Sequence, residues 1–417
     1  LFVQLFDEQK DPASRALMVE GLMQIAPQLA AKRAADYLAE VRNAEQVAPV
    51  LGVLLQSKNL PGLLAGALEG KKLETAVAAE AIRMVSTRGI TGPLMDSLKE
   101  AGQVKQMDRP LTPEEMSALV AKVGTEGDAK RGEAVYRRQQ LLCITCHAIG
   151  DAGGVLGPNL VSIGGSAPVD YLIESLLEPS KKIKEGYHMA IIGTKSGQVF
   201  SGGLVKDSPT EVVLRDPANQ LQTVPKADIA SQQMSPVSMM PAGLTASLRE
   251  DEFVDLVRFL SELGREGDFK ISPKRFVRVW QTMGAMEQAA VDHVRHVGLH
   301  VLNEDSYTLP WEPRTSLVSG ELPLDEIQTA QRMYPWHPKI ARFRLQQVEA
   351  GAVKLKLSSV NGLVLVVGER ILKDIQPELT LELPSGSTPV SILATKEAGA
   401  LSRLSVEILE GAAQVQP

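Results

Sequence analysis

The chain has 417 residues, of which 44% are hydrophobic and 23% are charged. These ordinary values exclude a wholly disordered chain, a collagen-like fibre or a coiled-coil rod, and the length predicts two to four domains. The net charge of −6 argues against general nucleic-acid binding, which depends on neutralising phosphates. No apolar run approaches a membrane span of about 18 residues. The chain starts at Leu1 without a secretory signal, which indicates a mature form or a segment of a longer protein.

Residues 1–105 carry the pattern of short helices. Asp11 and Pro12 form an N-cap followed by proline at the first helical position. Apolar residues follow at Leu17, Met18, Leu22 and Ile25. A second apolar group precedes a stop at Gly89 and consists of Val77, Ala81, Met84 and Val85. Such helix pairs predict either a small HEAT-like stack or an irregular helical cap, and no clean repeat register decides between the two.

The next part also begins with helices. Thr112-Pro113-Glu114-Glu115 is a capping box that starts a helix ending near residue 123, and residues 124–127 are expected to form a hinge. Asp128 caps a second helix, which runs through Gly132 and Tyr136 towards Cys143. A glycine-rich loop is then expected over residues 150–165, and a helix over residues 169–177.

Between Tyr187 and Met234 the hydrophobic period changes to two, which predicts short strands. The expected strands are 189–193, 198–205, 211–214 and 221–224, with turn sequences between them. The helical signal returns at a second capping box, Ser247 to Glu250, and Gly264 ends that helix. Its apolar face consists of Phe253, Leu256, Val257, Leu260 and Leu263.

Residues 269–417 are predicted to be mostly β. Apolar residues alternate as in strands with one buried face at Phe343/Leu345, Val353/Leu355/Leu357, Leu379/Leu381/Leu383 and Leu404/Val406/Ile408. Leu363 to Val367 is a continuous apolar run, which predicts a strand buried on both faces. The segment Phe276 to Gln281 resembles the opening of β-sandwich modules. We therefore expect an all-β sandwich of the jelly-roll, galactose-binding-like type.

The chemistry of the chain lies in Cys143-Ile144-Thr145-Cys146-His147. These are the only two cysteines, and a histidine directly follows the second. Thiols three positions apart can reach the two vinyl groups of one haem and form thioethers, while the adjacent histidine can offer its imidazole to the iron. The motif therefore predicts one covalently attached haem c, with His147 as an iron ligand.

Two other uses of this cysteine pair fit less well. Structural zinc needs four ligands, usually from a second cysteine pair or two histidines, and the sequence has no second cysteine pair. A thioredoxin-like dithiol needs an alternating strand–helix pattern, which the sequence around the motif lacks. We also find no nucleophile triad, phosphate loop or paired-carboxylate motif in the sequence, so no catalytic residue is predicted.

Residues 128–264 resemble a cytochrome c domain. Gly132 and Tyr136 match the glycine and the aromatic residue of that family's first helix, and the resemblance implies that the last helix crosses closely at the glycine. Pro158, within Gly157-Pro158-Asn159-Leu160, matches the family's proline. Its carbonyl is expected to accept the Nδ1 proton of His147 and so fix the orientation of the ring.

The resemblance also implies a methionine as the second iron ligand, in a loop before the last helix. Met240 is expected in this role because Pro241 holds it in an extended conformation. Met239 and His188 are the alternative ligands. A further alternative makes both methionines ordinary core residues.

The 92 residues between His147 and Met240 exceed the needs of a minimal cytochrome fold, and a β insertion at about residues 187–234 accounts for the excess. With Leu177 to Tyr187 ahead of the strands, the arrangement is similar to the planctomycete–verrucomicrobial group of haem-binding CxxCH domains, whose members often follow helical repeats. The expected organisation is a HEAT-like helical region at 1–105, a haem domain at 106–268 and a β-sandwich at 269–417.

Three weaker patterns each have a plain alternative. His293, His296 and His300 share one helical face as metal ligands would, but Gly298 interrupts that helix, which favours a solvated face. Basic residues either steer an acidic partner to the haem edge or form a solvated face; they are Arg137, Arg138, Lys181, Lys182 and Lys184. A core role is favoured over a sugar platform for Trp280, Trp311 and Trp336.

Together these features predict a c-type cytochrome that transfers single electrons, as acceptor or relay for a dehydrogenase or another cytochrome. It would be an electron-transfer subunit or a segment of a larger oxidoreductase rather than an enzyme by itself. Because c-type haem is attached after export, we expect a periplasmic or otherwise extracytoplasmic location and an export signal upstream of Leu1. The alternative is a haem-containing interaction or carbohydrate-binding protein that senses redox state or gas, with the carbohydrate at the C-terminal domain.

Overall fold

The structure is a computed structural model, and it describes most of the chain. The described residues are 11–55, 57, 59–87, 90, 92–104, 109–138, 141–216, 219–246, 248–284, 286–304, 309–330, 338–395, 398 and 401–416. Four residues named above therefore lie outside the described residues, namely Leu1, Gly89, Ser247 and Trp336. Within the described residues, no helix combines the length and the apolar character that crossing a membrane requires.

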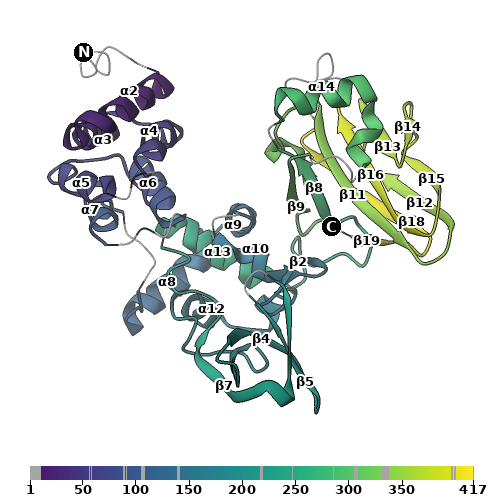
Figure 1. Cartoon of the computed structure of the whole chain (residues 1–417), viewed down its shortest axis with the longest axis horizontal. Helices are drawn as coiled ribbons and strands as arrows, with labels where there is room; N and C mark the ends of the chain where they lie inside the picture. The colour runs from purple at the N-terminus through teal and green to yellow at the C-terminus, as the bar shows by residue number, and fades with distance from the viewer. Residues whose placement is uncertain are drawn as a thin grey trace. The chain divides into compact units, whose positions relative to one another are not determined.

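The chain folds into two compact units, which are described separately. The first consists of Leu1–Cys143 and Ser166–Ser261, and the second of Ile144–Gly165 and Glu262–Pro417. Helices make up the N-terminal part and antiparallel sheets dominate the C-terminal part, which confirms the predicted combination of a helical and a β region (Figure 1).

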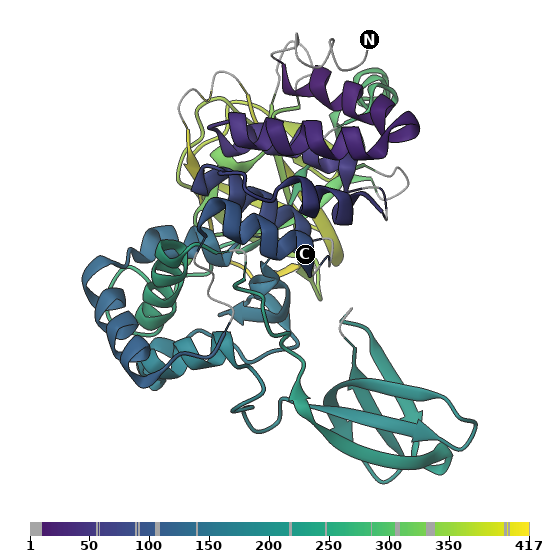
Figure 2. The same ribbon diagram turned by 90° about the vertical axis from the view of Figure 1, so that its left-hand side faces the viewer.

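Within the described part of residues 11–104, six α-helices of the first unit pack on one another (Figures 1 and 2). They are α2 (Pro12–Ile25), α3 (Pro27–Glu40), α4 (Val47–Leu54), α5 (Leu60–Ala67), α6 (Thr75–Thr87) and α7 (Pro93–Gly102). Asp11 caps α2 as predicted, because its carboxylate accepts a hydrogen bond from the Ser14 N–H at 2.8 Å. The apolar group on α6 is buried as expected.

The apolar residues predicted on α2 are only partly buried. Leu22 lies in the core, but Leu17 and Ile25 are 62% and 69% exposed. The helix instead turns Ala16 and Val19 inward, at three-residue steps from Leu22. Small residues thus form much of the buried face of α2. A prediction from the large apolar side chains alone therefore puts the buried face at the wrong positions.

Four further helices of the first unit lie within the part of the chain that the structure describes. They are α8 (Pro113–Glu126), α9 (Ala129–Tyr136), α12 (Val169–Leu177) and α13 (Glu250–Glu262). The predicted capping box at Thr112 and Glu115 is present, with both reciprocal hydrogen bonds. The predicted hinge at residues 124–127 is wrong, because α8 continues through Gly124 to Glu126 and ends at the Gly127 cap. A single exposed glycine costs a helix only about 1 kcal/mol, which the strong N-terminal cap offsets.

Along the chain, a five-stranded antiparallel sheet lies between α12 and α13. Its strands are β3 (His188–Thr194), β4 (Val199–Asp207), β5 (Glu211–Arg215), β6 (Leu221–Pro225) and β7 (Ile229–Ser238). The four predicted strands are all present. The order β6-β5-β4-β3-β7 brings the last strand back beside the first, after a short 3₁₀ turn at Lys226–Asp228. Ala190, Ile192, Val212, Leu214 and Val224 form the small core.

The C-terminal region of the second unit contains two main antiparallel sheets. The larger has the order β14-β13-β16-β11-β8-β9, with β19 also paired to β11, and the smaller has the order β15-β12-β18. The larger sheet consists of β8 (Val279–Met283), β9 (Trp311–Thr315), β11 (Lys339–Gln347), β13 (Leu363–Val367), β14 (Arg370–Leu372), β16 (Gly386–Ala394) and β19 (Gln414–Gln416). The smaller consists of β12 (Gly351–Leu357), β15 (Glu378–Leu383) and β18 (Val406–Glu410).

Apolar residues of both sheets share one core. Phe343 and Leu345 of the larger sheet belong to the same cluster as Val353 and Leu355 of the smaller. The run at β13 is buried on both faces as predicted, since Leu365 faces this cluster while Val366 joins a second one, with α14 (Gln288–Val297) and the 3₁₀ helix η4 (Leu299–Asn303). A short pair of strands, β10 (Leu322–Pro323) and β17 (Arg403–Leu404), also belongs to this region.

Candidate functional site

The two cysteines lie at the ends of one helical turn, α10 (Cys143–Cys146). Both are half-buried, and they are not joined in a disulfide. The Cys143 Sγ lies 3.6 Å from the carbonyl oxygen of Leu141, and burial raises the pKa of the Cys146 thiol. In a helical turn, positions three apart lie on the same side, so both thiols can serve one planar group.

His147 follows this turn at the start of strand β1 (His147–Ile149). Its Nδ1 lies 2.8 Å from the carbonyl oxygen of Pro158, the contact that the resemblance predicts. A carbonyl oxygen can only accept, so Nδ1 carries the proton and the ring lone pair is on Nε2. Burial lowers the pKa of His147, against an opposing effect of the Pro158 bond, and this favours the neutral ring that a metal needs as a ligand.

The predicted glycine-rich loop at 150–165 is partly structured, which corrects the sequence interpretation. Strand β2 (Ala152–Val155) pairs with β1, and a turn of helix, α11 (Ile163–Ser166), follows. Glycine content made this segment look irregular. Strand pairing prevails because the two short strands are joined by a tight turn with Gly150 at φ 70°.

The glycines of this segment permit close approach to the motif. A Cβ on Gly154 would lie 1.8 Å from the Thr145 carbonyl oxygen, and one on Gly157 would lie 2.4 Å from Cε1 of the His147 ring. The backbone also binds directly, since the Gly157 N–H donates to the Cys146 carbonyl at 2.8 Å. Sequence reasoning did not assign these glycines to the site, although their density directly after the motif was a visible signal.

Helices α9 and α13 cross at Gly132, the position expected from the resemblance. A Cβ there would lie 2.0 Å from the Asp255 carbonyl oxygen, so only glycine allows this approach. The Tyr136 and Phe259 rings pack beside the crossing, with centroids 5.6 Å apart. The buried Asp255 carboxylate accepts two hydrogen bonds from Arg131, at 2.7 and 2.9 Å, which tie the same two helices together.

Met240 and its alternatives lie at the end of the five-stranded sheet. Met239 and Met240 are half-buried, directly after β7, and the Met240 N–H donates to the Ser238 hydroxyl at 3.1 Å. His188 is the cross-strand partner of Ser238. The structure thus brings His188 close to the methionine segment. Met240 and His147 belong to different compact units, and an iron-binding role for Met240 stays a prediction.

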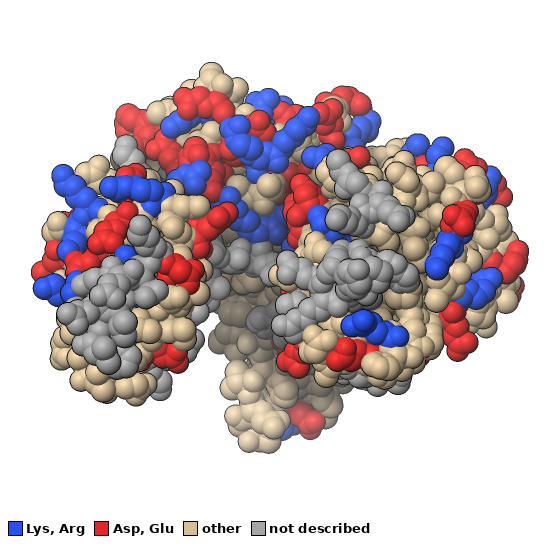
Figure 3. All heavy atoms as spheres, turned by 90° about the horizontal axis from the view of Figure 1, so that it is seen from above, with Lys and Arg blue, Asp and Glu red and all other residues tan. Residues whose placement is uncertain are grey.

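The basic residues near the predicted haem edge are largely paired with acids. Lys181 and Lys182 both contact the Glu174 carboxylate, at 2.7 and 2.8 Å, and Arg138 contacts Glu252 at 2.6 Å. Hydrogen bonds from these lysines lower the pKa of Glu174. Acidic and basic side chains are also interspersed on the face displayed in Figure 3. Partner steering by these residues stays a prediction.

The three histidines in the C-terminal region do not form a metal-binding group among the described residues. His293 and His296 lie on α14, which ends before Gly298 as predicted, and His300 lies on η4, 3.5 Å from Glu304. Among the residues that the structure describes, no three His, Cys, Asp or Glu side chains form a metal-binding group. Trp280 is fully buried and packs on Phe343, which confirms its core role.

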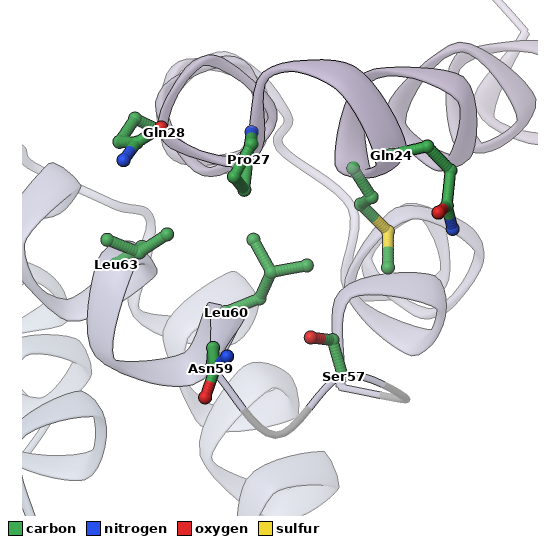
Figure 4. Close-up of a pocket in the computed structure, with 8 residues that line it drawn as sticks. Gln24, Pro27, Gln28, Ser57, Asn59, Leu60 and Leu63 are labelled. Atoms are coloured by element: carbon green, nitrogen blue, oxygen red, sulfur yellow. The ribbon is translucent and has the colours of Figure 1, made fainter.

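A cavity of about 430 Å³ lies in the N-terminal helices, away in sequence from the motif (Figure 4). Its lining combines apolar and uncharged polar side chains, namely Met23, Gln24, Pro27, Gln28, Ser57, Asn59, Leu60 and Leu63. None of the predicted site residues lines it, so we place the candidate site at the cysteine motif.

No protein-family model matches the chain, and no curated protein matches it. Function is therefore inferred from the residues of the site.

Proposed function

We propose that this protein is a c-type cytochrome, with one haem c bound covalently by Cys143 and Cys146 and its iron bound by His147. The observation that carries the proposal is the state of the His147 ring. Its Nδ1 is fixed on the Pro158 carbonyl at 2.8 Å, which leaves the lone pair on Nε2. A ring held in one tautomer by a backbone carbonyl is the usual condition of a metal-binding histidine.

The surroundings of the ring support the same group. Val155 is the cross-strand partner of His147 and is 58% exposed, so it offers apolar surface beside the motif. The Gly157 backbone packs against the ring where any side chain would collide. A flat apolar group tethered by two thioethers fits this combination of exposed apolar surface, paired thiols and a neutral imidazole.

The bound haem would supply one-electron chemistry at its iron. His147 and Met240 would be the protein ligands of the iron, and Pro158 would fix the orientation of the His147 imidazole. A thioether opposite a histidine favours Fe(II) and raises the potential, which suits an acceptor of electrons from a dehydrogenase or another cytochrome. This assignment makes the chain an electron-transfer subunit or segment of a larger oxidoreductase in the periplasm or another extracytoplasmic location.

The remaining parts fit an accessory role. We assign the N-terminal helices to a HEAT-like stack, and the C-terminal sheets to a jelly-roll sandwich with a galactose-binding-like fold. These parts would position the haem domain against its redox partner, and the sandwich is the part that a carbohydrate would bind.

Visible spectra of the purified protein, oxidised, reduced and reduced under carbon monoxide, test the proposal. A six-coordinate c-type spectrum that carbon monoxide does not change supports electron transfer. A covalent haem that binds carbon monoxide readily overturns the electron-transfer role and favours a gas or redox sensor.

A further inference from the structure

The loop that carries Pro158 is held by the side chain of the next residue, Asn159. The Asn159 Nδ2 donates to the Gly150 carbonyl oxygen at 2.6 Å. The Asn159 Oδ1 accepts from two backbone N–H groups, those of Gly150 at 3.2 Å and Val161 at 3.0 Å. One amide thus pairs with both backbone groups of Gly150 and closes its own loop at Val161.

The turn at Gly150 and Asp151, to which Asn159 is hydrogen-bonded, also contacts the C-terminal region of the same unit. A Cβ on Gly150 would meet Ile271 at 3.0 Å, so the turn lies directly against that side chain. The next residue, Asp151, lies 3.5 Å from Nε of Arg278, whose side chain is only 4% exposed. Arg278 is held in turn by the Val318 carbonyl oxygen at 3.0 Å. Asn159 therefore binds the Pro158 loop to a turn that Ile271 and Arg278 hold in place.

We propose that Asn159 is a positioning residue for His147, acting through the Pro158 carbonyl. The Pro158 oxygen must stay near 2.8 Å from Nδ1 to hold the ring, and Pro158 has no N–H of its own with which to anchor its loop. The loop around Pro158 has three anchors: the Gly157 N–H donates to the Cys146 carbonyl, the Asn159 amide pairs with Gly150, and the Leu160 N–H donates to the Ala148 carbonyl at 2.8 Å. The Asn159 amide is the anchor on the residue whose peptide carries the Pro158 oxygen. Its loss therefore loosens that peptide, while the Leu160 bond keeps the rest of the loop in place.

The consequence for the iron rests on the proposed function. A hydrogen bond from Nδ1–H to a carbonyl makes the imidazole a stronger donor to the metal and favours Fe(III). Loosening the Pro158 carbonyl weakens that bond, so Asn159→Ala is expected to raise the midpoint potential. The Nδ1 proton of His147 is then held less tightly by the Pro158 oxygen, so its exchange with solvent is expected to become faster whether or not haem is bound.

The test compares Asn159→Ala and Asn159→Asp with the wild-type full-length chain. Asn159→Asp keeps an acceptor for the two N–H groups and loses only the donor to Gly150, so its effects should be intermediate. Asn43→Ala is the matched control, because Asn43 also caps a local turn but lies in the N-terminal helices. Three quantities are measured: amide hydrogen exchange at Gly150 and Val161, exchange of the His147 Nδ1 proton from selective ¹⁵N-histidine NMR, and the midpoint potential.

In Asn159→Ala we expect exchange at Gly150 and Val161 to accelerate about threefold to tenfold, the factor for one lost hydrogen bond. We also expect faster exchange of the His147 Nδ1 proton and a positive shift of the potential. Unchanged amide exchange refutes the hydrogen bonds of Asn159. Faster amide exchange with unchanged Nδ1 proton exchange and an unchanged potential refutes the positioning role. Faster Nδ1 proton exchange in a chain to which the host attaches no haem supports the positioning role and overturns the proposed function.

Discussion

Replacing Gly132 with alanine tests the crossing of α9 and α13. The added Cβ would lie 2.0 Å from the Asp255 carbonyl oxygen and 2.7 Å from Cβ of Phe259, whereas ordinary Cβ contacts begin at 3.4 Å. The gap to the carbonyl is therefore 1.4 Å too short. The nearest atoms that the new methyl group would meet belong to the backbone of α13. A side-chain rotation cannot relieve this clash, so the two helices must move apart.

Separation loosens the pair of buried rings beside the crossing. Tyr136 and Phe259 pack with centroids 5.6 Å apart, and both are almost fully buried. Overpacking of a core typically costs about 1–3 kcal/mol of folding stability. Because the clash here is against backbone, we expect Gly132→Ala to lower the free energy of unfolding by about 3 kcal/mol. The backbone of Gly132 does not have a positive φ, so the cost is steric.

Gly124→Ala is the matched control. Gly124 lies inside α8, is exposed, and has nothing within 4 Å of an added Cβ. Alanine there should stabilise the helix by about 0.5–1 kcal/mol. Both variants are compared with wild type by urea unfolding followed by far-UV circular dichroism. Equal stabilities for the two alanine variants would refute the close crossing at Gly132.

Three further predictions concern other parts of the molecule. Gly157→Ala places a methyl group 2.4 Å from Cε1 of His147, so it should displace the ring and change the haem spectrum; an unaltered spectrum would contradict this. Met240→Ala should abolish the sulfur-to-iron charge-transfer band and lower the potential, whereas His188→Ala should leave the spectrum unchanged; the reverse result assigns the ligand to His188. Arg109 and the Thr112 N–H lower the pKa of Glu115 to about 2 from 4.5. The stabilisation by Glu115 is therefore complete above pH 4.5 and lost towards pH 2, so the stability difference between wild type and Glu115→Gln should shrink over that interval.

Local signals in the sequence predicted the helix starts well. Asp11, Thr112 and Asp128 all cap helices, because each supplies a side-chain acceptor for the first N–H groups. The helix over residues 169–177 has the predicted limits. Such features depend on a few neighbouring residues, so they are visible before any tertiary contact is known.

The features that sequence analysis missed depend on contacts between distant segments. Strand β7 has mostly exposed side chains and little alternation, and its pairing with β3 makes it a strand. Gly153, Gly154 and Gly157 look like loop residues until the cysteine turn is seen against them. At the candidate site, the motif alone predicts Cys143, Cys146 and His147. The hydrogen bonds between Asn159 and Gly150 depend on the folded loop and are visible only in the structure.

Attachment of the haem to the polypeptide is the most direct test of the account. The 417-residue chain is produced in a host that exports it and attaches c-type haem, and is then extracted with acidified organic solvent. We expect the haem to stay with the wild-type polypeptide, and to be released from a variant with Cys143→Ser and Cys146→Ser. Clean extraction of haem from the wild-type chain, or a chain that carries none, would contradict the proposed function.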